Sequence, residues 1–266
     1  SYATLQYSRG CPFRCEFCDI IVMFGRQPRM KRLEQVGREL DALRQAGIRS
    51  VFFVDDNLIG HRAQAKALLR FLQQYQQEHQ YAFSFGTEVS LNLAQDRELL
   101  ERFQAANFGW VFIGIESTDP ASLKETGKTQ NLREDPLISI RRLYAHGIDV
   151  LGGFIVGFDH DTLETFDHQH QFITDAGIQS AMVGLLTALP RTPLHARLQR
   201  EGRLRPTGGD SNNTQATTNI IPRNMSPAAM AEAYQNLYRR LLSDQGIERR
   251  IRNKGRFLRA PQYQSG

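Results

Sequence analysis

The sequence predicts an α/β protein, a partial (β/α)6 barrel of the TIM type followed by a C-terminal helical extension. Short apolar runs, rich in β-branched and aromatic residues, alternate with longer segments of helical periodicity. The runs are apolar almost throughout, which is typical of parallel strands covered by helices and joined by right-handed crossovers. The six predicted strands are residues 3–8, 50–55, 81–89, 109–116, 148–158 and 179–189.

Helical spacing separates these strands. Leucine and valine recur at intervals of three and four over residues 33–43, and Gly47 then ends the predicted helix. The same spacing returns over residues 68–75, after the second strand. Gly147 and Gly177 end later helices in the same way. The alternation therefore continues along the whole barrel segment.

The pattern changes after Pro190. Residues 203–227 are polar, rich in Gly, Asn, Thr and Pro, and have no period, which predicts a loop or linker. Within this stretch, residues 207–219 fit either a lid over the barrel mouth or a surface linker. We therefore predict a barrel domain over residues 1–202, and a linker with a helical extension over residues 203–266.

The extension contains an amphipathic helix and a basic run. Ser226 and Pro227 suit the N-cap and first turn of the helix. Residues 247–259 carry much of the excess behind the net charge of +5 and the pI near 9.3. The run lacks the interleaved aromatic residues of a nucleic-acid platform, so we predict a solvated helix face and no nucleic-acid partner. The apolar face of the helix is Met230, Tyr234, Leu237, Tyr238 and Leu241.

Length and composition predict a soluble, cytoplasmic protein. With 266 residues and 41% apolar residues, the chain can bury one large core. Residues 1–10 do not resemble a signal peptide, and the longest apolar run, residues 20–24, is too short to span a bilayer. The chain begins at Ser1 rather than Met, which favours a fragment whose N-terminal part is missing.

All three cysteines of the chain lie in SRGCPFRCEFCDI, residues 8–20. Cys11, Cys15 and Cys18 form a C-x3-C-x2-C pattern directly after the first predicted strand. The loops at the carboxyl ends of barrel strands carry the chemistry of such folds. An odd number of cysteines in a cytoplasmic chain argues against disulfides. The pattern instead predicts a metal site with three soft ligands.

Two metal sites suit three thiolates. Structural zinc needs a fourth ligand, and His61, His146 and His160 all lie at unconventional spacings from the cysteines. A cubane iron-sulfur cluster held by three cysteines leaves one iron open to an exchangeable ligand. The sequence favours the cluster, with zinc as the alternative.

The cysteine pattern resembles that of the radical S-adenosylmethionine (SAM) enzymes, including the aromatic Phe17 before the last cysteine. In that family the open iron of a 4Fe-4S cluster is chelated by the amino and carboxylate groups of SAM. An external donor reduces the cluster, which then cleaves SAM to methionine and a 5′-deoxyadenosyl radical. The resemblance implies that Cys11, Cys15 and Cys18 are catalytic cluster ligands and that Phe17 contributes to the cofactor site.

Polar residues at other strand ends extend the resemblance. The family places its loop for the methionine amino group after the second strand, which implies that role for Asp55, Asp56 and Asn57. A plain helix cap is the alternative for Asn57. Glu116 and Glu88 end the fourth and third strands, and both match acidic positions expected to bind SAM. A charge that closes an apolar strand is costly unless it is paired or solvated, which favours a site at Glu116.

Residues 153–157, GFIVG, resemble the G-x-I-x-G pattern of the family. There the glycines, Gly153 and Gly157 in this chain, let the backbone approach the adenine, and Ile155 packs on it. The fuller pattern ends in Glu three positions later, where this chain has His160.

Two C-terminal stretches are similar to the cobalamin-dependent branch of the family. Residues 185–204 resemble its sixth strand and following segment, with Arg191 in place of a usual glycine. Residues 219–225 resemble the extension of a subgroup that includes hopanoid and bacteriochlorophyll methylases. In this branch methylcobalamin supplies a methyl group to a carbon from which the radical has removed hydrogen. Its N-terminal cobalamin-binding domain has no counterpart here, so cobalamin is expected through a domain outside this chain.

The resemblance therefore implies a radical SAM domain for cobalamin-dependent C-methylation of an unactivated carbon in a small apolar substrate, a lipid or a tetrapyrrole. One alternative is a radical SAM enzyme without cobalamin. Another is a zinc-stabilised, non-catalytic binding module. A methylthiotransferase with a second cysteine-ligated cluster is disfavoured because the first cluster uses all three cysteines.

Overall fold

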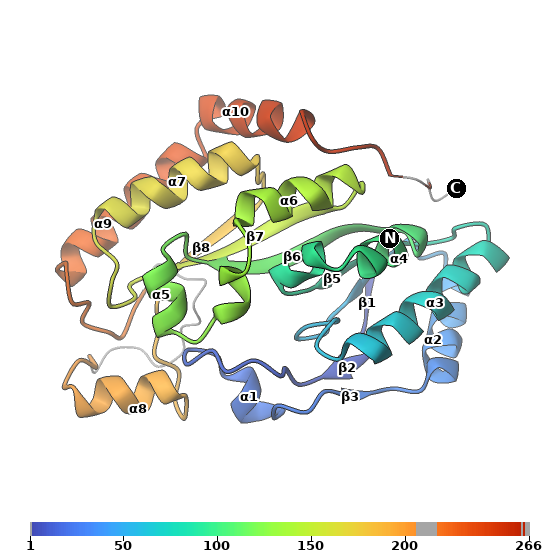
Figure 1. Ribbon diagram of the computed structural model, residues 1–266, viewed down its shortest axis with the longest axis horizontal. Helices are drawn as coiled ribbons and strands as arrows, with labels where there is room; N and C mark the ends of the chain where they lie inside the picture. Colours follow the sequence, from blue (N-terminus) through green and yellow to red (C-terminus); the bar gives the residue numbers. More distant parts are fainter. Residues whose placement is uncertain (1, 206–216, 262, 264–266) are drawn as a thin grey trace.

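The structure is a computed structural model and describes residues 2–205, 217–261 and 263. Its main sheet has six parallel strands in the order β1-β4-β5-β6-β7-β8, so each strand pairs with its neighbours in chain order (Figure 1). All six predicted strands are confirmed, and β1 and β8 remain at the edges of an open barrel among the described residues. These strands are β1 Tyr2–Leu5, β4 Ser50–Phe53, β5 Ser84–Glu88, β6 Phe108–Glu116, β7 Asp149–Val156 and β8 Ala181–Leu185.

Helices fill the connections as predicted. Gly47, Gly147 and Gly177 have φ of 71°, 73° and 68° and follow the last residues of α2, α6 and α7. In Figure 1, α7, α9 and α10 lie together above the sheet, and α1 and α8 lie below it. The helices are α1 Ile20–Met23, α2 Leu33–Gln45, α3 Arg62–Glu78, α4 Arg97–Ala105, α5 Pro120–Glu125, α6 Pro136–Ala145, α7 Glu164–Ala176, α8 Pro193–Arg200, α9 Pro227–Leu241 and α10 Asp244–Gly255. The short elements are β2 Ser8–Arg9, β3 Arg29–Met30, η1 Leu91–Gln95 and η2 Thr129–Leu132.

The buried apolar residues that the structure describes form two clusters. The larger one lies between the sheet and the helices that cover it, and the side chains of Phe53, Phe85 and Phe108 meet there with ring centroids 5.4 to 5.9 Å apart. The smaller one lies under the cysteine loop and joins it to α8. Its buried members are Cys15, Phe17, Ile155, Phe158, Leu186, Ala188, Leu194, Leu198 and Ile220.

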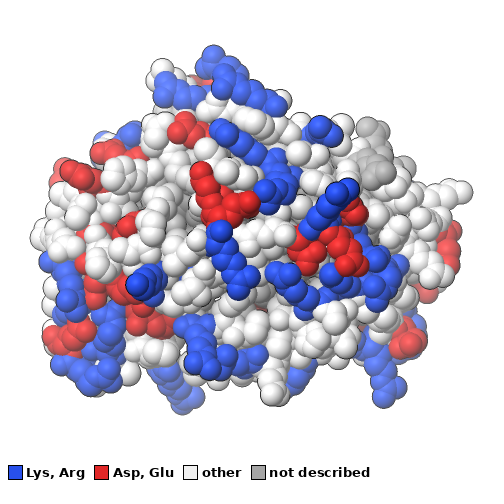
Figure 2. All heavy atoms as spheres, in the orientation of Figure 1, with Lys and Arg blue, Asp and Glu red and all other residues white. Residues whose placement is uncertain are grey.

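The helical extension forms as the sequence predicts. The Ser226 hydroxyl caps α9 by accepting the Ala229 N–H at 3.1 Å. The basic run lies on α10 and the turn after it, and Figure 2 shows Lys and Arg along this edge of the molecule. The run is not solvated throughout, because Arg250 and Lys254 are buried, and Lys254 Nζ lies 2.7 Å from Asp149 Oδ2.

The predicted linker is described only in part. Leu204 and Ile220 form a β-bridge, but most of residues 207–219 lie outside the described residues. Among the helices that are described, none is both long and apolar enough to cross a membrane.

Candidate active site

The cysteine loop, residues 11–18, connects β2 to α1 at the carboxyl end of the sheet. Gly10 begins it with φ of 101°, a left-handed conformation that favours glycine, and a Cβ there would lie 3.0 Å from the Gly25 carbonyl oxygen. The Cys11 N–H donates to the same oxygen at 3.3 Å. The Gly10 N–H donates to Asp56 Oδ2 at 2.7 Å. Asp56 and Gly25 thus hold the start of the loop.

Asp55 stabilises the chain just before this loop. It is buried, and its carboxylate accepts the N–H groups of Tyr7, at 3.0 Å, and of Ser8. Burial raises its pKa to about 6. Asp55 does not line the pocket, whereas its neighbours Asp56 and Asn57 do.

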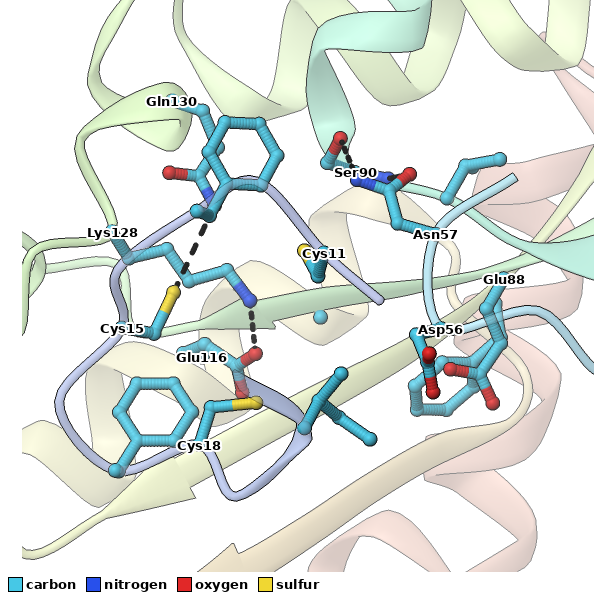
Figure 3. Close-up of a pocket in the computed structure, with 16 residues that line it drawn as sticks. Cys11, Cys15, Cys18, Asp56, Asn57, Glu88, Ser90, Glu116, Lys128 and Gln130 are labelled. Carbon is cyan, nitrogen blue, oxygen red and sulfur yellow. Dashed lines mark hydrogen bonds and ion pairs between the residues drawn. The ribbon is translucent and has the colours of Figure 1, made fainter. Parts of the chain in front are cut away.

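The three cysteines line one pocket (Figure 3). Burial raises the pKa of each thiol, and that of Cys18 to about 12. In Figure 3, Asp56 and Glu88 lie together at one end of the pocket, and Lys128 and Cys15 lie at the other. The other polar residues in its lining are Asn57, Ser90, Glu116 and Gln130.

Two opposite charges are paired at the end of β6. The Lys128 ammonium donates to Glu116 Oε1, and both side chains are about 90% buried. Burial, the largest single effect, lowers the pKa of Lys128, but the Glu116 carboxylate together with Cys15 and Cys18 outweighs it, and the pKa is raised. Glu116 has φ of 66°, and a Cβ on Gly114 would lie 2.7 Å from Lys128 Nζ. A side chain at position 114 would therefore displace the pair from this arrangement.

Carboxylates gather at the opposite end. Burial, followed by the charges of Asp56 and Asp55, raises the pKa of Glu88 to about 7. Asn57 is fixed beside them, since its Nδ2 lies 3.1 Å from Ser90 Oγ and its Oδ1 accepts the Ser90 N–H at 3.3 Å. The carboxylates at this end of the pocket suit a positively charged or hydrogen-bond-donating group of a ligand. The buried Lys128 ammonium at the other end suits a negatively charged group.

A second pocket adjoins the first and is more apolar. Gly153 and Ile155 line it, together with Phe17, and it shares Cys18 and Glu116 with the first pocket. A Cβ at Gly153 would lie 2.8 Å from the Phe112 ring, so this close approach needs glycine. The rest of its lining is Asp19, Phe112, Gly114, Phe154, Met182 and Leu189.

Gly157 lies outside both pockets. Its N–H donates to Asp161 Oδ2 at 2.8 Å, and a Cβ there would lie 3.1 Å from Leu186 Cβ. Its φ of 122° is reserved for glycine, so it has a structural role in the turn after β7. His160 is exposed and lies 3.8 Å from Glu125, away from the pockets.

Lys128 and Gln130 are pocket residues that sequence reasoning missed. Lys128 caps the N-terminus of η2 and Gln130 lies within it, in a segment that has neither a strand end nor a motif to mark it. Gln130 Nε2 lies 4.0 Å from Cys15 Sγ, and its buried Oε1 has no hydrogen-bond partner among the described residues. The available signal was the short polar run TGKTQN, residues 126–131, soon after the strand that ends in Glu116.

The donor set fits an iron-sulfur cluster better than zinc. No histidine lines either pocket within the described part of the chain. His61 caps α3 and His146 bonds to the Arg142 carbonyl, and neither lines a pocket with the thiols. Three thiols without a fourth protein ligand match a larger cluster with one open position.

Comparison with known proteins agrees with this chemistry. The sequence profile of the radical SAM superfamily matches residues 5–173, more than half of the chain. The chain belongs to the radical SAM superfamily. Its membership confirms the enzyme class that the cysteine motif predicted, and with it the 4Fe-4S and SAM cofactors. A second profile, a domain of unknown function called DUF4070, matches residues 192–265.

Related radical SAM proteins include methylases. The chain is 43% identical over 237 residues to the hopanoid C-2 methylase of Rhodopseudomonas palustris, covering 87% of this chain and 44% of that protein. It is 26% identical over 250 residues to the bacteriochlorophyllide d C-12(1)-methyltransferase of Chlorobaculum tepidum, covering 93% of this chain and 53% of that protein. The chain thus spans about half the length of these relatives.

A solved structure shares the fold. The radical SAM methyltransferase TsrM from Kitasatospora setae superposes with a TM-score of 0.68 at 18% identity, covering 88% of this chain and 47% of that one. This likeness confirms the predicted partial barrel.

Proposed function

We propose that this chain is the radical SAM domain of a cobalamin-dependent enzyme that methylates an unactivated carbon. The observation that supports it most is the convergence of Cys11, Cys15 and Cys18 on one pocket with charged residues from three strand ends. The three thiols would hold the 4Fe-4S cluster. When bound and reduced, the cluster supplies the electron that cleaves SAM to methionine and a 5′-deoxyadenosyl radical.

The charges of the first pocket suit the amino-acid end of SAM. Asp56 and Glu88 would accept hydrogen bonds from its amino group, and Lys128 would attract its carboxylate, because these acceptors and this cation line the pocket with the three cysteines. Glu116 would accept hydrogen bonds from SAM hydroxyls while it remains beside Lys128.

The second pocket suits the adenosine end. Ile155 would pack on the adenine, Gly153 would let it approach the strand, and Phe17 would close the side next to Cys18. An apolar lining here also keeps water away from a reactive carbon radical. Asp55 and Gly157 would support these contacts through the backbone rather than touch SAM.

The proposal also includes cobalamin, a substrate and an electron donor, none of which this chain supplies itself. Cobalamin use and methylation are supported by the relatives named hopanoid and bacteriochlorophyllide methyltransferases and by TsrM, whose structure holds cobalamin and a [4Fe-4S] cluster. The names of the hopanoid and bacteriochlorophyllide relatives support a small apolar substrate, a lipid or a tetrapyrrole. We further propose an external electron donor and a cytoplasmic location. We propose no nucleic-acid partner, and a domain boundary after residue 202.

The test is SAM cleavage by the reconstituted protein. We would load it anaerobically with iron and sulfide, reduce it with dithionite, add SAM and measure 5′-deoxyadenosine, with Cys15→Ala as control. Formation by the parent and not by the variant is expected. A parent protein that binds zinc and no iron-sulfur cluster would overturn the proposal.

A further inference from the structure

The segment after β8 packs against the outside of the cysteine loop. The Leu194 N–H, in the first turn of α8, donates to the Glu16 carbonyl at 3.0 Å. Glu16 lies between two of the cysteines in sequence. Leu194, Leu198 and Ile220 then join Cys15 and Phe17 in the smaller apolar cluster. Much of the wall behind the cysteine loop therefore comes from residues that match DUF4070.

Arg197 of α8 is the centre of an ion network at this contact. Its Nη2 lies 2.6 Å from Glu16 Oε1 and its Nε lies 3.2 Å from Glu16 Oε2, a bidentate pair. Its Nη1 lies 2.6 Å from Asp159 Oδ2, and Nη2 lies 3.3 Å from Glu125 Oε1. The guanidinium thus joins the cysteine loop to α5 and to the turn after β7.

Two further arginines complete the network. Asp159, which binds Arg197, also binds Arg203 at 2.7 Å and Arg223 at 3.0 Å. Glu201 pairs with the same two arginines, since its Oε2 lies 2.9 Å from Arg203 Nη1 and 3.1 Å from Arg223 Nη2. The backbone agrees, since the Ile221 N–H donates to the Arg203 carbonyl at 2.9 Å. Arg203 and Arg223, which are 20 positions apart in sequence, therefore both pair with Asp159, the carboxylate that also pairs with Arg197.

The cysteine loop is irregular and has few backbone hydrogen bonds among its own described residues. Its described backbone bonds include Cys18 N–H to the Cys15 carbonyl at 3.2 Å and Glu16 N–H to the Thr126 carbonyl at 3.0 Å. A site must hold its ligands to within about 0.5 Å, so an irregular loop needs ties from its surroundings. Glu16 is tied by its N–H, its carbonyl and its carboxylate at once, and two of these three ties end on α8.

We propose that the first part of the DUF4070 segment, α8 with residues 203–205 and 217–223, is a clamp on the cysteine loop, and that Arg197 is its positioning residue. The inference rests on the proposed function only for the identity of the group that the loop holds. Lysine cannot replace Arg197 fully, because its single ammonium cannot form the planar two-point contact with Glu16.

The first test follows retention of the cluster. In reconstituted protein, Arg197→Gln should lose iron to a chelator about tenfold faster than the parent, with Arg197→Lys in between. The matched control is Arg142→Gln, which breaks another bidentate pair, to Glu134 at 2.9 and 2.8 Å, on α6. The control should keep the parent rate. Equal rates for the parent and Arg197→Gln, or equal acceleration in both variants, would overturn the clamp.

The second test needs no cluster. Amide hydrogen exchange over residues 15–18 of the metal-free protein should be about tenfold faster in Arg197→Gln than in the parent and unchanged in Arg142→Gln. If Arg197→Gln does not fold, Glu16→Gln tests the same contact, since it removes the charge and one of the two acceptors. Unchanged exchange in the variant would reject the clamp. A parent that binds no cluster would reject the proposed function instead, and exchange would still decide the clamp.

Discussion

The pair of Lys128 and Glu116 puts two buried charges beside the three thiols. Each charge loses most of its hydration, so each is tolerated only because the other is present. Gly114 leaves room for the pair, since a side chain there would come too close to both charged groups.

Removing one partner should therefore destabilise the folded protein strongly. Lys128→Met leaves Glu116 buried without its counter-charge, and we expect a loss of about 3 to 5 kcal/mol in the free energy of unfolding. Lys66→Met is the matched control. It breaks an exposed pair with Glu98 at 2.5 Å and should cost about 1 kcal/mol or less. Urea unfolding of both variants measures the difference, and equal small losses would contradict the buried pair.

Asp161 makes stability depend on pH. It accepts the N–H groups of Gly157 and Phe158 at 2.8 and 3.0 Å and the Ser122 hydroxyl at 2.9 Å. Burial raises its pKa from 3.8 to about 6, so the folded state holds the proton more tightly than the unfolded state does. Its contribution is complete below pH 3.8 and is lost as the pH rises through 6.

Asp161→Asn should remove this dependence. The stability lost in the variant should be larger at pH 4.5 than at pH 7.5, about 1 to 3 kcal/mol at the lower pH because buried donors lose an acceptor. Exposed Asp175→Asn serves as the control. Urea unfolding at the two pH values checks the result. A loss of stability in Asp161→Asn that is larger at pH 7.5 than at pH 4.5 would contradict the prediction.

At the scale of elements, α9 completes an edge strand. Among the described strands, β8 pairs with β7 alone. The Val183 N–H on this edge strand still has a partner, because the Tyr238 hydroxyl accepts it at 3.0 Å. Tyr238 and Tyr234 also donate to the Val183 carbonyl, at 2.9 and 3.0 Å. The helical extension thus takes the place of a seventh strand at this point.

The two tyrosines should differ when they lose their hydroxyls. Tyr238→Phe leaves the Val183 N–H without a partner and should cost about 1 to 3 kcal/mol. Tyr234→Phe removes one of two donors to the carbonyl and should cost less, about 1 kcal/mol. Thermal unfolding of both variants compares them, and a larger loss for Tyr234→Phe would show that Tyr238 does not protect the strand edge.

For the whole molecule, loading the cysteine loop should raise stability. A group that binds the folded chain and not the unfolded chain stabilises it, and displacing protons from three buried thiols makes the gain larger at higher pH. We expect chelation of the reconstituted protein to lower Tm by about 5 °C. Cys15→Ala should show the same Tm with and without iron, and an equal drop in that variant would place the metal elsewhere.

Local patterns were sufficient to predict the sheet and the position of the chemistry. The six strands, the helix ends at Gly47 and Gly147, and the cysteine loop after the first strand all depend on residues close in sequence. Parallel strands then bring their carboxyl ends to one edge, which is why Asp56 and Glu116 could be expected beside the cysteines.

Only the tertiary structure decided which neighbours face the site. Backbone direction turns Asp55 away from the pocket and Asp56 towards it, although both follow the same strand. Lys128 reaches the thiols because the chain folds back after α5. The Glu16 to Arg197 contact joins residues 181 positions apart, and no periodicity in sequence encodes a pairing over that distance. The sequence by itself therefore determined the elements and the chemistry of the loop, whereas packing decided the charges around it, because charge pairs form between surfaces that meet only in the folded chain.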